Sequence, residues 1–303
     1  KNQADALAYQ TEKSLKEFGD KISAEEKARI ESAITTLKEA VASEDAARMT
    51  TRRMPPFAPD WAFFLDIDGT LLEFAARPQE VRVEPGLLDL LAQLHAAAGG
   101  AIALISGRSV EDIDKLFAPL AFPAAGQHGT ERRAADGSIR RHAPPLNDLG
   151  RAAAGIVRLT AAHSGLVFEN KGMTLALHYR LAPGLRVLAE REMRAIAVEL
   201  GDAFELQTGK FVMEIKPSGK DKGSAIAEFA AEAPFAGRRP VFIGDDLTDE
   251  PGFEVVNRLG GHSVKVGAGI SRARWHLFDS AAVRRWLASY IEQVSPQAAK
   301  LQG

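Results

Sequence analysis

The chain has 303 residues, of which 46% are apolar and 26% are charged, and its formal net charge is -2. This length favours two packed domains, and this composition is that of an ordinary globular protein rather than a fibrous or disordered one. A net charge so close to zero argues against nucleic acid or an anionic membrane as a partner attracted by bulk charge, and it says nothing of protein partners.

The chain contains no cysteine. This excludes disulfides, thiolate metal sites and cysteine nucleophiles, and it fits a reducing compartment. No apolar run approaches the ~20 residues that a membrane-spanning helix needs, and the first residues are polar and charged. The sequence therefore predicts a cytoplasmic protein without a membrane or export segment.

Residues 1–48 have the pattern of a separate helical unit. Ser23 and Glu26 form a capping-box signature, and apolar residues follow at helical spacing. These are Ile30, Ile34, Leu37 and Val41. The segment resembles part of the helical lid of heat-shock chaperones, but the sequence has neither their ATPase nor their peptide-binding sandwich, so we expect an appendage without chaperone function. Residues 49–60, rich in charge and proline, read as a linker.

Residues 61–129 and 217–303 alternate apolar runs with helical stretches. The clearest strands are AFFLDID, AIALISG and PVFIGDD. This alternation predicts an α/β core that is doubly wound, mainly parallel and Rossmann-like, with both faces of its sheet covered. Because such sheets bind ligands at the carboxyl ends of their strands, the polar clusters that follow these runs should converge.

Residues 130–216 depart from this rhythm and predict an inserted α/β cap domain. A hairpin signal at 135–138 leads to a helix near 148–162, and a second helix is expected near 185–200. The expected strands are LVFEN, TLALHYR, FELQT and FVMEI.

The pentapeptide DIDGT directly follows the first apolar run. Asp66 and Asp68 fall on the same side of an extended chain, and two close carboxylates call for a divalent cation. Thr70 offers a hydroxyl and a main-chain amide to an anion. An acid-rich turn that merely ends a strand is the alternative.

Two further motifs supply groups that can bind an anion. Ser106 and Arg108 follow the second apolar run, in SGR, and can donate hydrogen bonds to phosphate. Lys222 begins a helix within GKDKG, where the helix dipole disfavours a cation unless an anionic partner is present. A solvated arginine and a solvated lysine are the alternatives.

The motif GDDLTDE follows the strand PVFI and gathers four acids on one loop. Such a loop requires a hard cation or a lysine to offset its charge, and oxygen ligands suit Mg²⁺. The acidic start of a helix is the alternative, which explains Asp249 and Glu250 better than it explains Asp245. An EF-hand calcium loop is excluded because its twelve-residue ligand run is absent.

Taken in order, these four motifs resemble those of the haloacid dehalogenase superfamily over about 61–293. The resemblance implies Asp66 as nucleophile and Asp68 as acid and base. It implies Mg²⁺ held by Asp66, the main-chain carbonyl of Asp68 and Asp245, with Asp249 and Arg108 in support. Phosphoryl oxygens would be received by Thr70, Ser106 and Lys222.

Five motifs of the chain resemble those of trehalose-6-phosphate phosphatases: GQHGTE, FENKG, HYR, GKFVMEIKP and GDDLTDE. The resemblance implies hydrolysis of trehalose 6-phosphate, a small-molecule substrate, and it departs from the family at Pro251 and in the amino-terminal unit. The implied substrate-binding residues are Gln127, His128, Glu131, Glu169, Lys171 and Glu214. For the first three a hinge role is an alternative, and exposed charge on a sheet is the alternative for the others.

Two other function classes remain open on the sequence. One is a different haloacid dehalogenase-type sugar phosphatase or a phosphomutase, which a panel of substrates would separate. The other is a non-catalytic binding module, against which the intact pair Asp66 and Asp68 argues.

Overall fold

The computed structural model of the chain describes residues 54–73, 81–142 and 149–301. Both of its sheets lie in one compact unit formed by 55–266 and 272–303. The capping box predicted at Ser23 and Glu26 and the helix predicted after it lie outside the described residues.

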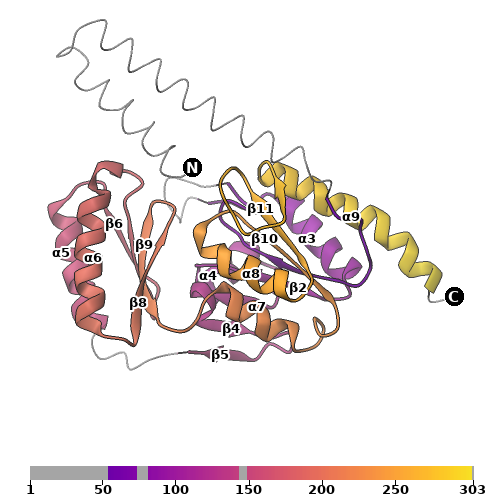
Figure 1. The fold of residues 1–303 in the computed structure, drawn as a ribbon, viewed down its shortest axis with the longest axis horizontal. Helices are drawn as coiled ribbons and strands as arrows, with labels where there is room; N and C mark the ends of the chain where they lie inside the picture. Colours follow the sequence, from indigo (N-terminus) through magenta and orange to yellow (C-terminus); the bar gives the residue numbers. More distant parts are fainter. Residues whose placement is uncertain (1–53, 74–80, 143–148, 302–303) are drawn as a thin grey trace, which may run out of the picture. The chain divides into compact units, whose positions relative to one another are not determined.

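The larger sheet has eight strands in the order β12-β11-β10-β1-β2-β3-β4-β5 (Figure 1). Pairing is parallel from β12 to β3 and antiparallel for β4 and β5. This confirms the prediction of a mainly parallel α/β core. The strands are β1 (Trp61–Leu65), β2 (Ile102–Ile105), β3 (Ala124–Gly126), β4 (Glu131–Arg133), β5 (Ile139–Arg141), β10 (Arg239–Gly244), β11 (His262–Val266) and β12 (Trp275–Leu277).

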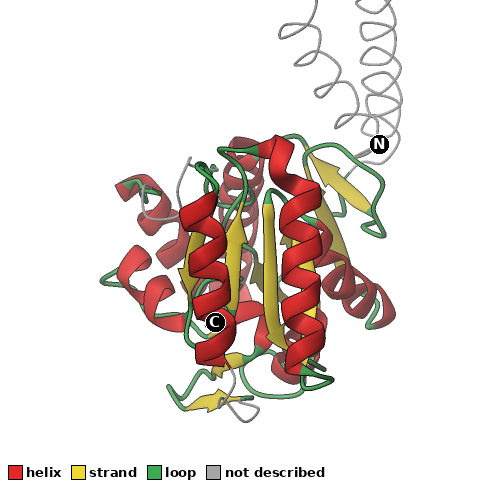
Figure 2. Cartoon of the chain, turned by 90° about the vertical axis from the view of Figure 1, so that its left-hand side faces the viewer, coloured by secondary structure: helices red, strands yellow, loops and turns green. Residues whose placement is uncertain are grey.

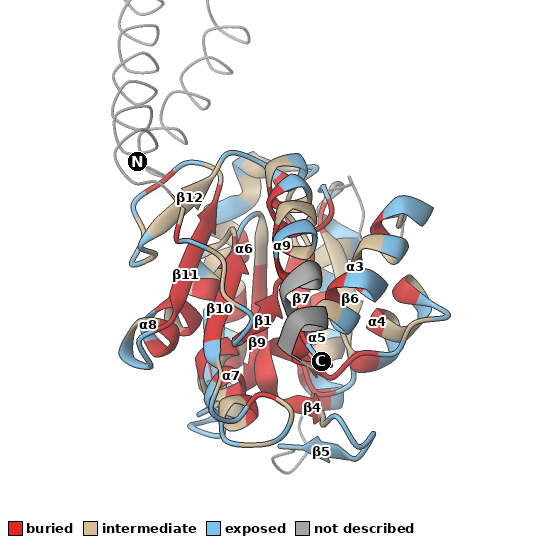
Figure 3. Cartoon of the chain, turned by 90° about the vertical axis from the view of Figure 1, so that its right-hand side faces the viewer, coloured by how far each residue is buried: buried red, intermediate tan, exposed pale blue. Residues whose placement is uncertain are grey.

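Helices cover both faces of this sheet because its strands are apolar on both sides. Phe63 of β1 meets the ring of Tyr290 at 4.7 Å between centroids, whereas the next residue, Phe64, stacks on Phe235 at 5.3 Å. Figure 3 shows β1, β10 and β11 as buried, whereas Figure 2, seen from the opposite side, has the helices of the second, smaller sheet in front. The helices are α3 (Pro85–Ala97), α4 (Val110–Phe117), α7 (Lys222–Ala230), α8 (Glu250–Arg258) and α9 (Ser280–Leu301).

Local sequence accounts for where several helices begin. Ser109 accepts a hydrogen bond from the amide of Asp112 and so caps α4, and Asp221 forms a capping box with Ser224 at the start of α7. Proline occupies the first turn of α8, where its missing N–H costs nothing. These caps place the first residues of α7 and α8 at the carboxyl ends of the strands.

The smaller sheet has four antiparallel strands in the order β6-β7-β9-β8. Two helices pack on it, and their buried residues Ile156 and Met193 share an apolar cluster with Leu177 and Met213 of the sheet. The strands are β6 (Val167–Asn170), β7 (Leu175–His178), β8 (Phe204–Gly209) and β9 (Val212–Pro217), and the helices are α5 (Leu149–Ala162) and α6 (Arg186–Leu200).

The predicted hairpin at 135–138 is present, but the strands it joins belong to the larger sheet. β4 pairs with β3 through Ala124 and Arg133, Ala125 and Arg132, because only a short 3₁₀ turn, Gln127–Gly129, separates the two strands. The second sheet therefore starts at β6. The sequence analysis places the start of the cap earlier, at residue 130. The domain boundaries themselves stay a prediction.

Candidate active site

Three acidic side chains converge at the carboxyl ends of β1 and β10. Asp66 directly follows β1, and its amide donates to the carbonyl of Ile243 at 3.0 Å. Carboxylate oxygens of Asp66, Asp245 and Asp249 all lie within 4.8 Å of one another. Adjacent parallel strands thus bring residues that are far apart in the sequence to one edge of the sheet, as the motifs predict.

Lys222 lies between two of these acids. Its Nζ donates to Asp66 Oδ1 at 2.7 Å and to Asp249 Oδ1 at 2.6 Å. Burial alone would lower the pKa of Lys222, but Asp249 and Asp66 raise it well above its ordinary value. The lysine is therefore a fixed positive charge at the start of α7, held by Asp249 as well as by Asp66.

The Asp249 carboxylate is saturated by hydrogen-bond donors. Its second oxygen accepts the amides of Asp245 and Asp246, both at 2.9 Å. Gly244 makes this approach feasible, because a Cβ there would lie 2.4 Å from the carboxyl carbon of Asp249. Asp249 thus shapes the loop more readily than it offers a free oxygen to a metal.

Asp66 and Asp245 are the acids of this cluster whose pKa values are raised. Burial and Asp249 raise the pKa of Asp66 to about 7 against the opposing effect of Lys222. Burial and the charges of Asp66 and Asp249 likewise raise the pKa of Asp245 well above its usual range. Within the described ranges, Asp245 Oδ1 is buried without a hydrogen-bond partner. A divalent cation fits this set, because it would satisfy that oxygen and offset both charges.

Arg108 holds the second acid of DIDGT. Its Nε and Nη2 donate to the two carboxylate oxygens of Asp68, each at 2.7 Å. Such a two-pronged pair fixes the orientation of both side chains. Ser106 and Thr70 are buried beside this pair of motifs, and Thr70 Oγ1 has no hydrogen-bond partner among the residues that the structure describes. Of the predicted phosphate receptors, Ser106 and Lys222 line the pocket, whereas Thr70 does not.

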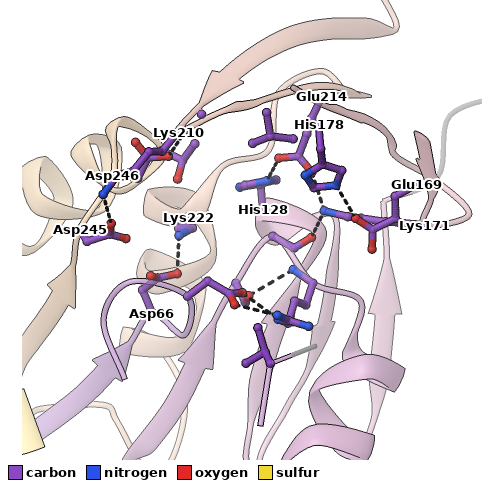
Figure 4. Close-up of a pocket in the computed structure, with 18 of the residues that line it drawn as sticks. Asp66, His128, Glu169, Lys171, His178, Lys210, Glu214, Lys222, Asp245 and Asp246 are labelled. Carbon is purple, nitrogen blue, oxygen red and sulfur yellow. Dashed lines mark hydrogen bonds and ion pairs between the residues drawn. The ribbon is translucent and has the colours of Figure 1, made fainter. Parts of the chain in front are cut away.

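Strands β6, β7 and β9 contribute a second polar group to the same pocket (Figure 4). Glu169 pairs with His178 at 2.8 Å, and Lys171 donates to Glu214 at 2.6 Å. Burial raises the pKa of Glu214, but His128 and Lys171 outweigh it and hold the pKa well below its usual range. Each of these carboxylates is paired with a basic side chain, and the three residues predicted for the sugar lie together.

Not every residue predicted to bind substrate lines the pocket. The lining residues among those described include His128, Glu169, Lys171 and Glu214 but neither Gln127 nor Glu131. Gln127 and Glu131 instead bond to each other, from Nε2 to Oε1 at 2.8 Å. Their spacing of four residues carries no signal for this pairing, since it arises in a turn rather than in a helix.

Four ionisable residues that line the pocket escape the sequence analysis as site residues: His178, Arg180, Lys210 and Asp246. The amide of Lys210, at the tip of the β8–β9 hairpin, donates to Asp246 at 2.8 Å, and Lys210 Nζ lies 3.9 Å from Asp245. The only available signal is their position in HYR, GKFVMEIKP and GDDLTDE. A motif does not tell which of its side chains face a pocket.

The fold with this site defines a class of enzyme. A solved phosphatase of the haloalkanoate (HAD) enzyme superfamily, from Bacteroides thetaiotaomicron, matches with a TM-score of 0.53 at 16% identity, covering 80% of this chain and 99% of its own. That likeness concerns the fold alone. It confirms the predicted haloacid dehalogenase-type architecture.

Sequence comparison then identifies the family. The trehalose-phosphatase family model matches residues 64–277, so the chain belongs to the trehalose-phosphatase family. A trehalose-6-phosphate phosphatase of Escherichia coli (strain K12) is 46% identical over 77% of this chain and 87% of its own length. The crystal structure of a trehalose-6-phosphate phosphatase related protein is 29% identical with a TM-score of 0.67, covering 78% of this chain and 99% of that one.

Two expectations lie outside these findings. The likeness of 1–48 to a chaperone lid falls before the matched segment and outside the described residues, and it stays a prediction. Within the described ranges, no helix is both long and apolar enough to cross a bilayer. The cytoplasmic location also stays a prediction.

Proposed function

We propose that this protein hydrolyses trehalose 6-phosphate to trehalose and phosphate. The observation that carries the proposal is one pocket in which Asp66 and Lys222 lie opposite Glu169, Lys171 and Glu214. The first pair can take up a phosphoryl group, while the three cap residues offer donors and acceptors to sugar hydroxyls. The name of the Escherichia coli relative at 46% identity supports the same substrate.

Asp66 is the proposed nucleophile. Lys222 holds Oδ1, which leaves Oδ2 to attack phosphorus while the bond between phosphorus and the sugar oxygen breaks. Asp68, entering the cycle in its protonated form, protonates the departing oxygen, and as a carboxylate it then takes a proton from the water that cleaves the aspartyl-phosphate. The two-pronged pair with Arg108 orients the ionised form of Asp68, in which both oxygens accept hydrogen bonds.

The transferred phosphoryl oxygens are received by Thr70, Ser106 and Lys222. Thr70 Oγ1 is buried and lacks a partner among the described residues, so it can donate to an oxygen without breaking an existing bond. Lys222 supplies a full positive charge from the start of α7. Phosphoryl transfer depends mainly on such positioning and charge neutralisation.

Mg²⁺ is the proposed cofactor. Asp66, the main-chain carbonyl of Asp68 and Asp245 would hold it, and the buried, unpartnered Asp245 Oδ1 supports this set of ligands. When bound, the ion would neutralise charge on the acids and on the phosphoryl group. Asp249 is left out of the set because both of its oxygens accept N–H groups.

The unit built on β6 to β9 is the proposed cap, and it selects the sugar. Glu169, Lys171 and Glu214 are partly or fully buried, so they are already desolvated and oriented before substrate arrives. Oriented polar groups discriminate strongly between substrates that satisfy them and substrates that do not. The same pocket would hold the sugar away from water during transfer.

A panel of phosphate esters tests this function. We expect phosphate release from trehalose 6-phosphate in the presence of Mg²⁺, loss of release with a chelator, and slower turnover of glucose 6-phosphate, sucrose 6-phosphate and p-nitrophenyl phosphate. Faster turnover of another sugar phosphate would contradict the substrate. Isomerised product without free phosphate would indicate a phosphomutase, and no turnover of any ester would indicate a binding module.

A further inference from the structure

The turn between β3 and β4 has an uncommon backbone. Gln127 and His128 are consecutive non-glycine residues in the left-handed region, with φ values of 46° and 58°. Side chains with a Cβ adopt this region rarely, although histidine does so more often than most residues, and two such residues in succession are uncommon. Such a conformation persists only where the surroundings impose it, and it often occurs at functional sites.

The core imposes this conformation through several hydrogen bonds. The amides of Gln127 and His128 donate to the carbonyls of Arg108 at 2.8 Å and Ser106 at 3.0 Å. Glu131 Oε1 accepts both the Gln127 side chain at 2.8 Å and the amide of Val110 at 3.1 Å. The turn is therefore fixed by groups of the catalytic core, and Gln127 and Glu131 act as its supports.

Glycine on the facing loop allows the His128 ring to approach. A Cβ on Gly107 would lie 2.6 Å from His128 Nε2, far inside van der Waals contact. The ring thus lies directly against the SGR segment. The same nitrogen, Nε2, also contacts Glu214 Oε2 of the smaller sheet.

His128 and Glu214 belong to a chain of contacts between core and cap. Glu214 Oε1 accepts Lys171 Nζ at 2.6 Å, and the same ammonium donates to the carbonyl of Gly107 at 2.9 Å. The side chains of His128, Glu214 and Lys171 are 6%, 4% and 9% exposed. Two core groups and two cap groups therefore satisfy one another without solvent.

The contacts define the tautomer of His128. An ionised carboxylate only accepts hydrogen bonds, so Nε2 must carry the proton that Glu214 receives. Nδ1 is buried and has no partner among the described residues, which suits a bare lone pair better than a second N–H. Burial lowers the pKa of His128 more than Glu214 raises it, with Lys222 and Lys171 adding to the decrease. Nε2 is therefore the protonated nitrogen in the contact with Glu214.

We propose that His128 is a positioning residue of the core which fixes Glu214, and through it Lys171, in the arrangement that recognises the sugar. This inference rests on the proposed function. On this proposal His128 does not contact the sugar directly. Gln127 and Glu131 stabilise the turn rather than bind substrate. Selectivity for the sugar then depends on a residue that the cap itself does not supply.

A pair of matched substitutions tests the proposal. His128→Asn suits the left-handed backbone, because asparagine tolerates it best, but its side chain does not reach Glu214. His128→Gln places an amide N–H near the position of Nε2. We expect His128→Asn to lower the ratio of kcat/KM for trehalose 6-phosphate over p-nitrophenyl phosphate roughly tenfold or more, since one hydrogen bond to a charged group is lost. His128→Gln should regain most of that ratio.

A double-mutant cycle separates this role from a merely structural one. In a Glu214→Ala background, His128→Asn should change the ratio by less than about twofold, because the residue through which it acts is gone. An additive loss in the double variant, or an unchanged ratio in His128→Asn, overturns the proposal. Absence of trehalose 6-phosphate hydrolysis by the wild-type protein contradicts the proposed function instead.

The wild-type protein provides a test that requires no variant. Nitrogen-15 chemical shifts of the His128 ring at neutral pH should show a proton on Nε2. A ring protonated at Nδ1 alone could not donate to Glu214. That result overturns the proposal even if His128→Asn does not fold.

Discussion

The core and the cap sides of the pocket differ in how their charges are balanced. On the core side, Asp66 and Asp245 have raised pKa values, which burial and neighbouring acids cause. On the cap side, burial opposes ionisation, but basic partners hold the pKa values of Glu169 and Glu214 below their usual range. The core thus needs a cation. The carboxylates of the cap already have basic partners, so this side of the pocket suits a neutral, hydroxyl-rich group. Chemistry common to all phosphate esters should depend on the core, and selectivity on the cap.

The largest expected effect comes from the core. Asp66→Asn replaces the anionic nucleophile by an amide, so turnover of both trehalose 6-phosphate and p-nitrophenyl phosphate should fall at least about a thousandfold. Initial rates of phosphate release measure this. Glu111→Gln, which breaks an exposed pair with Lys115, is the control and should change rates little. Substantial activity of folded Asp66→Asn would remove the covalent mechanism.

An intermediate effect is expected from the cap, and it should differ between substrates. Glu169→Ala, Lys171→Ala and Glu214→Ala should each reduce kcat/KM for trehalose 6-phosphate about ten- to a hundredfold more than for p-nitrophenyl phosphate, because buried hydrogen bonds to the sugar are lost. Both kcat and KM should be measured.

Glu190→Ala on α6 is a control for these variants within the cap, since it affects only a surface pair with Arg194. Equal losses on both substrates in all three pocket variants would show that these residues support folding or closure of the cap. The conclusion that selectivity depends on the cap and the chemistry on the core would then be wrong.

A smaller effect concerns stability rather than catalysis. Burial, with Arg239 and Arg274, lowers the pKa of His262 to about 4, and its ring lies 4.9 Å from that of Trp61. The unfolded chain therefore binds a proton below pH ~6.5 that the folded protein does not, so stability falls as the pH decreases from there to about 4.

We expect this residue to account for about 2–3 kcal/mol of the decrease in the free energy of unfolding over that range. Urea unfolding across the range measures it. His262→Phe should flatten the curve, whereas His142→Phe, at an exposed position, should leave it unchanged. An identical curve for His262→Phe would show that other groups cause the acid sensitivity.

The smallest effect is expected from the amino-terminal segment. All residues of the proposed site lie between 66 and 249, so removal of residues 1–48 should change turnover by less than about twofold. Steady-state kinetics of the shortened chain measures this. A soluble but inactive product would show that the segment contributes to the site.

The same comparison shows what the sequence can predict. Apolar runs that end in polar clusters predict β1, β2 and β10 and the convergence of Asp66, Ser106 and Asp245, because parallel strands share a carboxyl edge. The sequence predicts the hairpin at 135–138 but places it in the cap, whereas its strands pair with the larger sheet. A turn signal does not indicate which neighbouring strand a hairpin joins.

Pairings between distant residues could not be predicted. Lys171 meets the carbonyl of Gly107 across 64 positions, and His128 meets Glu214 across 86. No local pattern encodes such contacts, which depend on how the two sheets face each other. The hydrogen bond between Gln127 and Glu131, away from the pocket, could not be predicted for a related reason. It depends on backbone angles that residue types alone do not indicate.

The account is tested most directly by following the phosphoryl group of labelled trehalose 6-phosphate in a single turnover. Mixing with excess enzyme and Mg²⁺, quenching in acid and mapping the labelled peptide should place the label on Asp66, with trehalose released at the same rate as the label appears. That result would show that the phosphoryl group of trehalose 6-phosphate, the substrate that the cap selects, is transferred to Asp66 of the core. Release of phosphate without label at Asp66, or label from other sugar phosphates but none from trehalose 6-phosphate, would contradict it.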